Sequence, residues 1–171
     1  RDRAAMTPCP ALDRVEFLRA RGVEAEIVAP GVPVPTVAAA AAAMGCGRNR
    51  IIKSILFHAP DGRCVMVIAR GDTRVDVRRV ERLTGLSALK LARPGVVLER
   101  TGYPAGGTPP VGHRETFPVI VDTRVAAQGW GWAGGGRPEL LVKIRAADVV
   151  RLSGAEIKDV VSAESPGQQS P

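Results

Sequence analysis

Apolar residues recur at helical spacing in several short stretches of the chain. Over residues 11–21 they fall on one helix face, charged residues occupy the opposite face, and Gly22 supplies a stop. Thr36 and Asp76 are N-cap candidates, and Pro94 suits a first helical position. Six consecutive alanines after Thr36 predict a closely packing helix. Further helices are expected over residues 36–45, 77–85, 94–102 and 146–154.

Short runs of β-branched and apolar residues predict strands between these helices. The Asp61-Gly62 pair between two such runs is a strong signal for a β-hairpin. Strands are expected around residues 25–29, 50–58, 63–69, 88–92, 117–122, 139–144 and 156–161.

The order of these elements favours an α+β fold over a parallel α/β fold. Strands come as hairpins and as runs broken by helices, without regular βαβ alternation. We therefore expect a single domain over residues 11–161, with a mixed, mainly antiparallel, curved sheet and surrounding helices. Residues 1–10 and 162–171 lack apolar periodicity and are expected to be flexible tails.

The net charge of +7 and the pI of about 10.1 indicate a basic surface that attracts phosphate groups. A GC-rich genome also produces arginine-rich chains, so charge alone leaves the nucleic-acid interpretation open. No apolar run of membrane-spanning length and no secretory pattern is present, and three widely spaced cysteines suggest reduced thiols. We expect a soluble cytoplasmic protein without membrane association. Two histidines and three scattered cysteines offer no metal-ligand spacing, so no metal and no cofactor is expected.

Lys53 interrupts an apolar strand face. In "RIIKSILFH" a period of two places it with Ile51, Ile55 and Phe57. Its stem could pack on the sheet while the ammonium reaches water. Alternatively, the cation could stand at the floor of a pocket, where it would bind phosphate or polarise a carbonyl. The spacing does not decide between the two.

A glycine- and proline-rich segment over residues 101–113, "TGYPAGGTPPVGH", breaks the regular pattern. Long irregular loops are uncommon in compact domains, and glycines allow a backbone to lie close to a ligand. A surface connection is the plainer interpretation, but we favour a binding site. A second glycine run, residues 134–136, is either a hairpin turn or the opposing wall of the same pocket.

Other candidate side chains carry less weight. Asp122 is expected either to cap the following turn or to pair with Lys53. His113 has no carboxylate close in sequence to orient it as a base. No nucleophile motif appears, and the spacing of Gly102, Gly106 and Gly107 does not fit a dinucleotide-binding fingerprint.

Four motifs in order resemble the YbaK family, also called the prolyl-tRNA-synthetase-associated editing domain. They are "IIKSILF", "RTGYPAGGTPPVGH", "PVIVD" and "AGGGRPELLVKIRAADVV", and the resemblance covers roughly residues 11–161. It implies an α+β pseudo-barrel domain that acts as a free-standing aminoacyl-tRNA deacylase on mischarged tRNA, such as Cys-tRNA(Pro) or Ala-tRNA(Pro). Aminoacylated tRNA, and a synthetase that delivers it, are the partners this implies.

The resemblance also implies roles for residues. Lys53 matches the strand lysine that places the terminal nucleotide and the ester, and Gly106 and Gly107 belong to the loop that closes around the aminoacyl group. We expect these three to be catalytic. The expected substrate-binding residues are Tyr103, Thr108, Pro109, Pro110, Gly112, His113, Asp122, Gly134, Gly135 and Gly136.

Departures from the family pattern leave the substrate open. Ala133 stands where cysteine-specific members carry serine, and Leu140-Leu141 lacks their acidic residue. A catalytically inactive RNA-binding or interaction domain is therefore the main rival, and hydrolysis of a small acyl ester unrelated to tRNA is a second. Because no side chain is a convincing base, the resemblance suggests that the ribose hydroxyl beside the ester helps to activate the attacking water.

Overall fold

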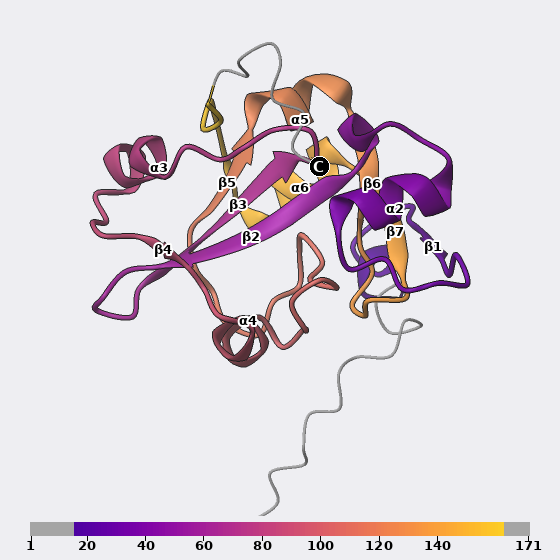
Figure 1. The fold of residues 1–171 in the computed structure, drawn as a ribbon, viewed down its shortest axis with the longest axis horizontal. Helices are drawn as coiled ribbons and strands as arrows, with labels where there is room; N and C mark the ends of the chain where they lie inside the picture. The colour runs from indigo at the N-terminus through magenta and orange to yellow at the C-terminus, as the bar shows by residue number, and fades with distance from the viewer. Residues whose placement is uncertain (1–15, 163–171) are drawn as a thin grey trace, which may run out of the picture.

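Two β-sheets meet at one corner of the molecule in the computed structural model, which describes residues 16–162 (Figure 1). The first sheet has the order β1 (Glu26–Val28), β7 (Leu141–Arg145) and β6 (Trp130–Gly134). The second has the order β4 (Lys90–Leu91), β2 (Ile52–His58), β3 (Cys64–Arg70), β5 (Val119–Asp122) and β8 (Glu156–Lys158). A bridge between Ile51 and Trp132 links the two.

The strand directions confirm the expected mixed, mainly antiparallel α+β fold. Within these sheets, β3–β5 and β5–β8 are parallel pairs and the other neighbours are antiparallel. The two sheets do not close into a barrel. The expected tails, residues 1–10 and 162–171, lie outside the described residues apart from Ser162.

Helix boundaries follow the local signals in the sequence. Thr36 Oγ1 accepts a hydrogen bond from Ala39 N (3.1 Å), and Asp76 Oδ1 accepts one from Arg78 N (3.1 Å). Pro94 opens its helix as expected. The helices are α2 (Val37–Met44), α3 (Val77–Thr84), α4 (Pro94–Thr101), α5 (Thr123–Gln128) and α6 (Ala146–Ser153), with a 3-10 turn η1 (Arg48–Arg50). Of the helix expected over residues 11–21, residues 16–19 are helical and the start lies outside the described part.

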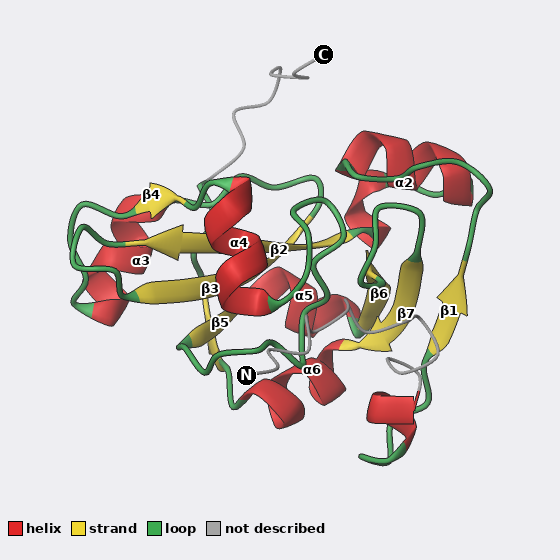
Figure 2. Ribbon diagram, turned by 90° about the horizontal axis from the view of Figure 1, so that it is seen from below, coloured by secondary structure: helices red, strands yellow, loops and turns green. Residues whose placement is uncertain are grey.

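Helices cover both faces of the larger sheet. Val97 of α4 packs in one core cluster with Leu56 and Met66, whereas Val80 of α3 packs in another with Phe57 and Val65. Figure 2 shows α4 lying across β2 and β3. None of the helices within residues 16–162 is long and apolar enough to cross a membrane.

A third core cluster lies where α2 meets the corner between the sheets. It contains Ala40 and Ala41 of α2, together with Val34, Ile51 and Leu141. Alanine side chains add little bulk, so the helix axis can approach the strands closely. Two alanines of the run, Ala40 and Ala41, therefore act in packing, whereas Ala38, Ala42 and Ala43 are exposed.

Asp122 joins three elements at the end of β5. Its side chain is fully buried, Oδ2 accepts a hydrogen bond from Arg124 N (3.0 Å), and Oδ1 accepts one from Val160 N (3.1 Å). The carboxylate therefore caps α5, a helix that the sequence pattern did not indicate, and fixes the chain after β8. These contacts match the capping alternative and not a pair with Lys53, which hydrogen-bonds elsewhere.

We expect Asp122→Ala to lower the free energy of unfolding by about 2–4 kcal/mol, because it removes a cap and leaves a buried N–H without an acceptor. Asp76→Ala is the matched control, since Asp76 caps α3 and is more exposed than Asp122. The control should cost only about 1 kcal/mol. Urea denaturation measures both, and equal losses would contradict this account of Asp122.

Candidate functional site

A small cavity of about 150 Å³ opens at the corner between the two sheets. It is walled by the segment leading into α2, the start of β2, the end of β6 and the loop after α4. Four of the expected site residues line it, namely Lys53, Gly106, Thr108 and Gly134. The other lining residues are Val34, Pro35, Thr36, Val37, Ala40, Ile51, Ile52, Ser54, Trp132, Ala133 and Leu141.

Lys53 is half-buried in the wall of this cavity, and its ammonium donates a hydrogen bond to the carbonyl oxygen of Thr73. Burial lowers the pKa of Lys53 from its ordinary value, and the nearby carboxylate of Asp72 opposes this by raising it. Arg70 holds that carboxylate through two hydrogen bonds, of 2.5 Å and 2.9 Å. The cation is therefore fixed beside the cavity, which agrees with the pocket alternative and not with a head group in open water.

The Thr73 carbonyl reaches Lys53 because the chain turns sharply after β3. Gly71 N donates to Ile51 O (2.7 Å), which brings this turn back to the beginning of β2. A Cβ on Gly71 would lie 2.6 Å from Arg48 O and 2.7 Å from Val37 Cγ1. Glycine is therefore required here by the packing of three segments, a constraint that does not show in the sequence pattern.

The loop over residues 102–113 is ordered by its own hydrogen bonds. Gly107 N and Thr108 Oγ1 both donate to Pro104 O, each at 3.0 Å. His113 Nε2 lies 2.6 Å from Pro109 O, and its ring stacks on Phe117 with centroids 5.2 Å apart. His113 therefore braces the loop, and it does not line the cavity.

The two glycine segments form one continuous wall and not two opposing walls. Gly136 N donates to Gly107 O (2.8 Å), and a Cβ on Gly107 would lie 2.6 Å from the carbonyl carbon of Arg137. A Cβ on Gly134 would overlap the carbonyl oxygen of Thr108. The backbones thus touch where side chains would separate them. Gly134 is also the last residue of β6, and the turn itself begins at Gly135, whose N–H donates to Leu140 O (3.0 Å).

Several expected substrate-binding residues lie behind this wall and do not line the cavity. Tyr103 is buried, and its ring would touch a Cβ on Gly136 at 3.4 Å. The other expected substrate-binding residues outside the lining are Pro109, Pro110, Gly112, His113, Asp122, Gly135 and Gly136. Gly107, which was expected to be catalytic, does not line the cavity either. The N–H of Gly107 is already used by Pro104 O, so it does not point to an oxyanion. Gly106, by contrast, is exposed, and within residues 16–162 its N–H donates no hydrogen bond to a backbone carbonyl.

One side of the cavity is formed by residues that the sequence pattern did not single out. Val34, Pro35, Thr36 and Val37 line it, and a Cβ on Gly106 would lie 2.9 Å from Pro35 Cβ. The stretch "APGVPVPT" has the composition of a loop and could have raised this segment as a candidate.

The polar groups of the cavity are few. Its lining holds Lys53 and three hydroxyl side chains, and no carboxylate, imidazole or thiol. Ser54 Oγ is buried and has no hydrogen-bond partner among the described residues. Within residues 16–162 no cluster of three His, Cys, Asp or Glu side chains could hold a metal ion. The lining therefore offers one cation and three hydroxyl groups, beside apolar side chains, to a small guest.

Comparison with known proteins places this site in a family. The model of the aminoacyl-tRNA editing domain matches residues 32–152, which include all the lining residues. The chain therefore belongs to the aminoacyl-tRNA editing domain family, as the motifs predicted.

Individual relatives agree with this assignment. The chain is 33% identical over 111 residues to a proline–tRNA ligase of Nitratidesulfovibrio vulgaris, covering 65% of this chain but 19% of the ligase. It is 35% identical over 87 residues to the uncharacterized protein YwhH of Bacillus subtilis, covering 51% of this chain and 55% of YwhH. A solved structure, described as a candidate trans-editing enzyme for prolyl-tRNA synthetase, superposes with a TM-score of 0.76 at 30% identity. That match covers 90% of this chain and 98% of the other.

The continuous wall makes a steric prediction. Gly107→Ala should lower the free energy of unfolding by about 1–3 kcal/mol, because its Cβ would force the loop away from Arg137. Gly95→Ala is the control, since a Cβ at this position in α4 meets nothing within 4 Å. Chemical denaturation compares them. A loss at Gly107 no larger than at Gly95 would show that the two glycine segments are not in contact.

Proposed function

We propose that this chain is an aminoacyl-tRNA deacylase that hydrolyses the ester joining a wrong, small amino acid to tRNA(Pro). The observation that carries the proposal is the fixed Lys53 ammonium in the wall of a cavity formed by loop backbone, in a chain of the editing family. The likeness to a candidate trans-editing structure over nearly its whole length supports action on tRNA released by a synthetase.

The cavity supports a small aminoacyl group, such as alanine or cysteine. Its volume is about 150 Å³, and apolar side chains such as Val34, Ile51 and Leu141 contribute to its lining. Binding alone distinguishes amino acids by only about 1–3 kcal/mol per methylene, so exclusion by size is an effective second test. The glycine backbone lies so close to Pro35 and Arg137 that an added Cβ would meet them at 2.9 Å and 2.6 Å, so this wall leaves little room for a larger side chain of the substrate to displace it.

The chemistry we propose needs a water, the substrate and two groups of the chain. Lys53 Nζ and the N–H of Gly106 would donate hydrogen bonds to oxygens of the ester, where negative charge develops when water attacks the carbonyl carbon. The carbon–oxygen bond to the ribose then breaks, giving the amino acid and a tRNA with its hydroxyl restored. Since no basic side chain other than Lys53 lines the cavity, we propose that the neighbouring ribose hydroxyl of the substrate orients the water.

The direct test is hydrolysis of tRNA(Pro) charged with alanine, cysteine or proline. We expect Lys53→Ala to lower kcat/KM for the preferred substrate by about 10²–10³, because one preorganised donor is lost. Lys53→Arg keeps the charge but not the geometry and should recover little. Lys90→Ala removes an exposed lysine from β4 and is the matched control.

Two outcomes would overturn parts of this proposal. If kcat/KM of Lys53→Ala stays within about threefold of the value for the unmodified protein, Lys53 has no part in the mechanism. Salt-dependent tRNA binding by the unmodified protein without ester loss on any of the three substrates would instead identify an inactive RNA-binding member of the family.

A further inference from the structure

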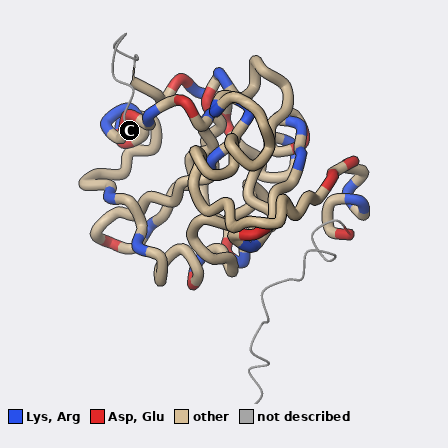
Figure 3. Tube along the Cα trace, turned by 45° about the vertical axis from the view of Figure 1, so that its right-hand side comes forward, with Lys and Arg blue, Asp and Glu red and all other residues tan. Residues whose placement is uncertain are grey.

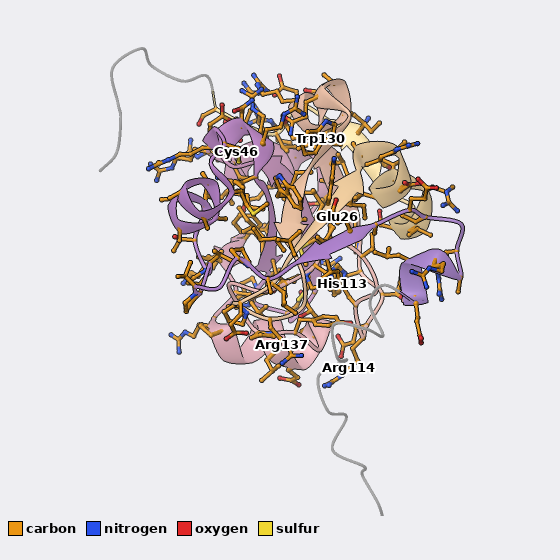
Figure 4. All side chains as sticks on the ribbon, turned by 90° about the vertical axis from the view of Figure 1, so that its right-hand side faces the viewer. Glu26, Cys46, His113, Arg114, Trp130 and Arg137 are labelled. Carbon is orange, nitrogen blue, oxygen red and sulfur yellow. The ribbon has the colours of Figure 1, made fainter. Side chains whose placement is uncertain are left out.

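The outer face of the smaller sheet forms a wider hollow, of about 610 Å³, away from the cavity at Lys53. Figure 4 looks onto this face, with Glu26 on β1 and Trp130 on β6. The hollow is lined by Glu24, Ala25, Glu26, Gly129, Trp130, Lys143, Ile144 and Arg145. The function proposed above leaves this surface unused.

Strand register determines which side chains share this outer face. Trp130 lies opposite Arg145, and Lys143 lies between Trp132 on β6 and Glu26 on β1. The intervening residues of β7, Val142 and Ile144, point to the core. At one end of the face, α2 covers Leu141 and Trp132; the other end, with Trp130, stays open.

Two cations are held on the ring of Trp130. The Arg50 guanidinium carbon lies 4.4 Å from the ring centroid, and Lys143 Nζ lies 4.5 Å from it. Arg50 Nη1 also donates to Trp130 O (3.2 Å), which fixes the guanidinium further. In the part of the chain that the structure describes, neither Arg50 nor Lys143 forms an ion pair, although Glu26 faces Lys143 in the register.

The charges around Trp130 indicate a nucleic-acid partner more specifically than the net charge of the chain does. Figure 3 shows basic and acidic residues distributed over all sides of the described trace. Several arginines elsewhere, such as Arg70 and Arg100, pair with carboxylates. At Trp130, two cations adjoin an aromatic ring and, among the described residues, neither is paired with a carboxylate. This combination is typical of surfaces that bind single-stranded nucleic acid.

The hollow and the cavity are both lined by residues of strand β6. Trp130 lines the hollow and Trp132 lines the cavity, and their rings meet edge to face with centroids 6.3 Å apart. The two residues are separated by about 7 Å along β6, since a strand rises about 3.4 Å per residue. A chain whose end enters the cavity would therefore pass Trp132 and reach the cations at Trp130 next.

We propose that Arg50, Trp130 and Lys143 bind the sugar–phosphate backbone of the unpaired nucleotides that precede the aminoacylated end of the tRNA. This assignment rests on the proposed function for the direction of the strand. Arg50 and Lys143 contact phosphates, and Trp130 is a positioning residue that holds both cations. Glu24 and Glu26 repel phosphate, so they confine the strand to the β6 side of the hollow.

The test uses a short unacylated single-stranded RNA ending in CCA. Its binding is followed by tryptophan fluorescence, since both tryptophans of the chain lie along this path. We expect Arg50→Ala/Lys143→Ala to weaken binding at least tenfold. The slope of log K against log salt should become shallower by about 1.4, because two phosphate contacts of about 0.7 each are lost. Arg78→Ala/Arg82→Ala, on exposed positions of α3, removes the same charge and should have little effect.

A kinetic arm separates this role from a structural one. The double variant should raise KM for mischarged tRNA about tenfold with kcat within twofold, and leave hydrolysis of the corresponding aminoacyl-adenosine ester unchanged. Thermal unfolding checks that the variant folds, and Lys143→Glu gives an independent variant at an exposed position.

The outcomes distinguish this inference from the proposed function. RNA binding that weakens in the double variant, in a protein that hydrolyses no mischarged tRNA, would retain the surface and reject the deacylase. RNA affinity and salt dependence equal to those of the unmodified protein would overturn the surface, even where deacylation is intact.

Discussion

The hydrogen bond from the Lys53 ammonium to the Thr73 carbonyl is the interaction on which the site depends. Burying an ammonium is unfavourable unless polar partners replace its water. Here a backbone oxygen and the carboxylate of Asp72 provide that replacement, and Arg70 in turn fixes Asp72. The cation can therefore stay charged inside a wall of the cavity, because its partners come from a turn that packing holds in place.

The same corner of the molecule provides the shape of the site. The bridge between Ile51 and Trp132 brings the two sheets together immediately beside Lys53, and α2 closes the corner through Ala40 and Ala41. Glycine at position 107 then lets the loop after α4 lie directly on the backbone near Arg137. A cation, a small cavity and a wall of closely packed backbone are thus consequences of one packing arrangement.

Local signals in the sequence were sufficient to predict most of the helices and strands. The caps at Thr36 and Asp76, Pro94 and the Asp61-Gly62 turn act within a few residues, so they could be predicted without knowing the tertiary structure. The cavity at Lys53 could be predicted in part from the sequence. An interrupted strand face and a glycine-rich loop indicated a site, and the family motifs indicated its chemistry.

The remaining features depend on contacts between distant segments, which spacing does not encode. The contact of Gly107 with Arg137, the requirement for glycine at position 71 and the wall at Val34 and Pro35 all join segments at least 20 residues apart. For the same reason, the sequence could not show that Tyr103 and His113 lie outside the cavity lining, where they pack against Gly136 and hydrogen-bond within the loop.

The most direct test of this account is the pKa of Lys53, measured by NMR of labelled lysine side chains. The chain has four lysines, and comparison with Lys53→Arg assigns the signal. We predict a pKa below that of an ordinary lysine, about 10.4, and a further decrease in Asp72→Asn, because the carboxylate that favours the charged form is lost. The protonated form, and with it deacylation, should then disappear as pH rises through this lowered value. An ordinary pKa that does not respond to Asp72→Asn would contradict the account, since it would place the ammonium in open water.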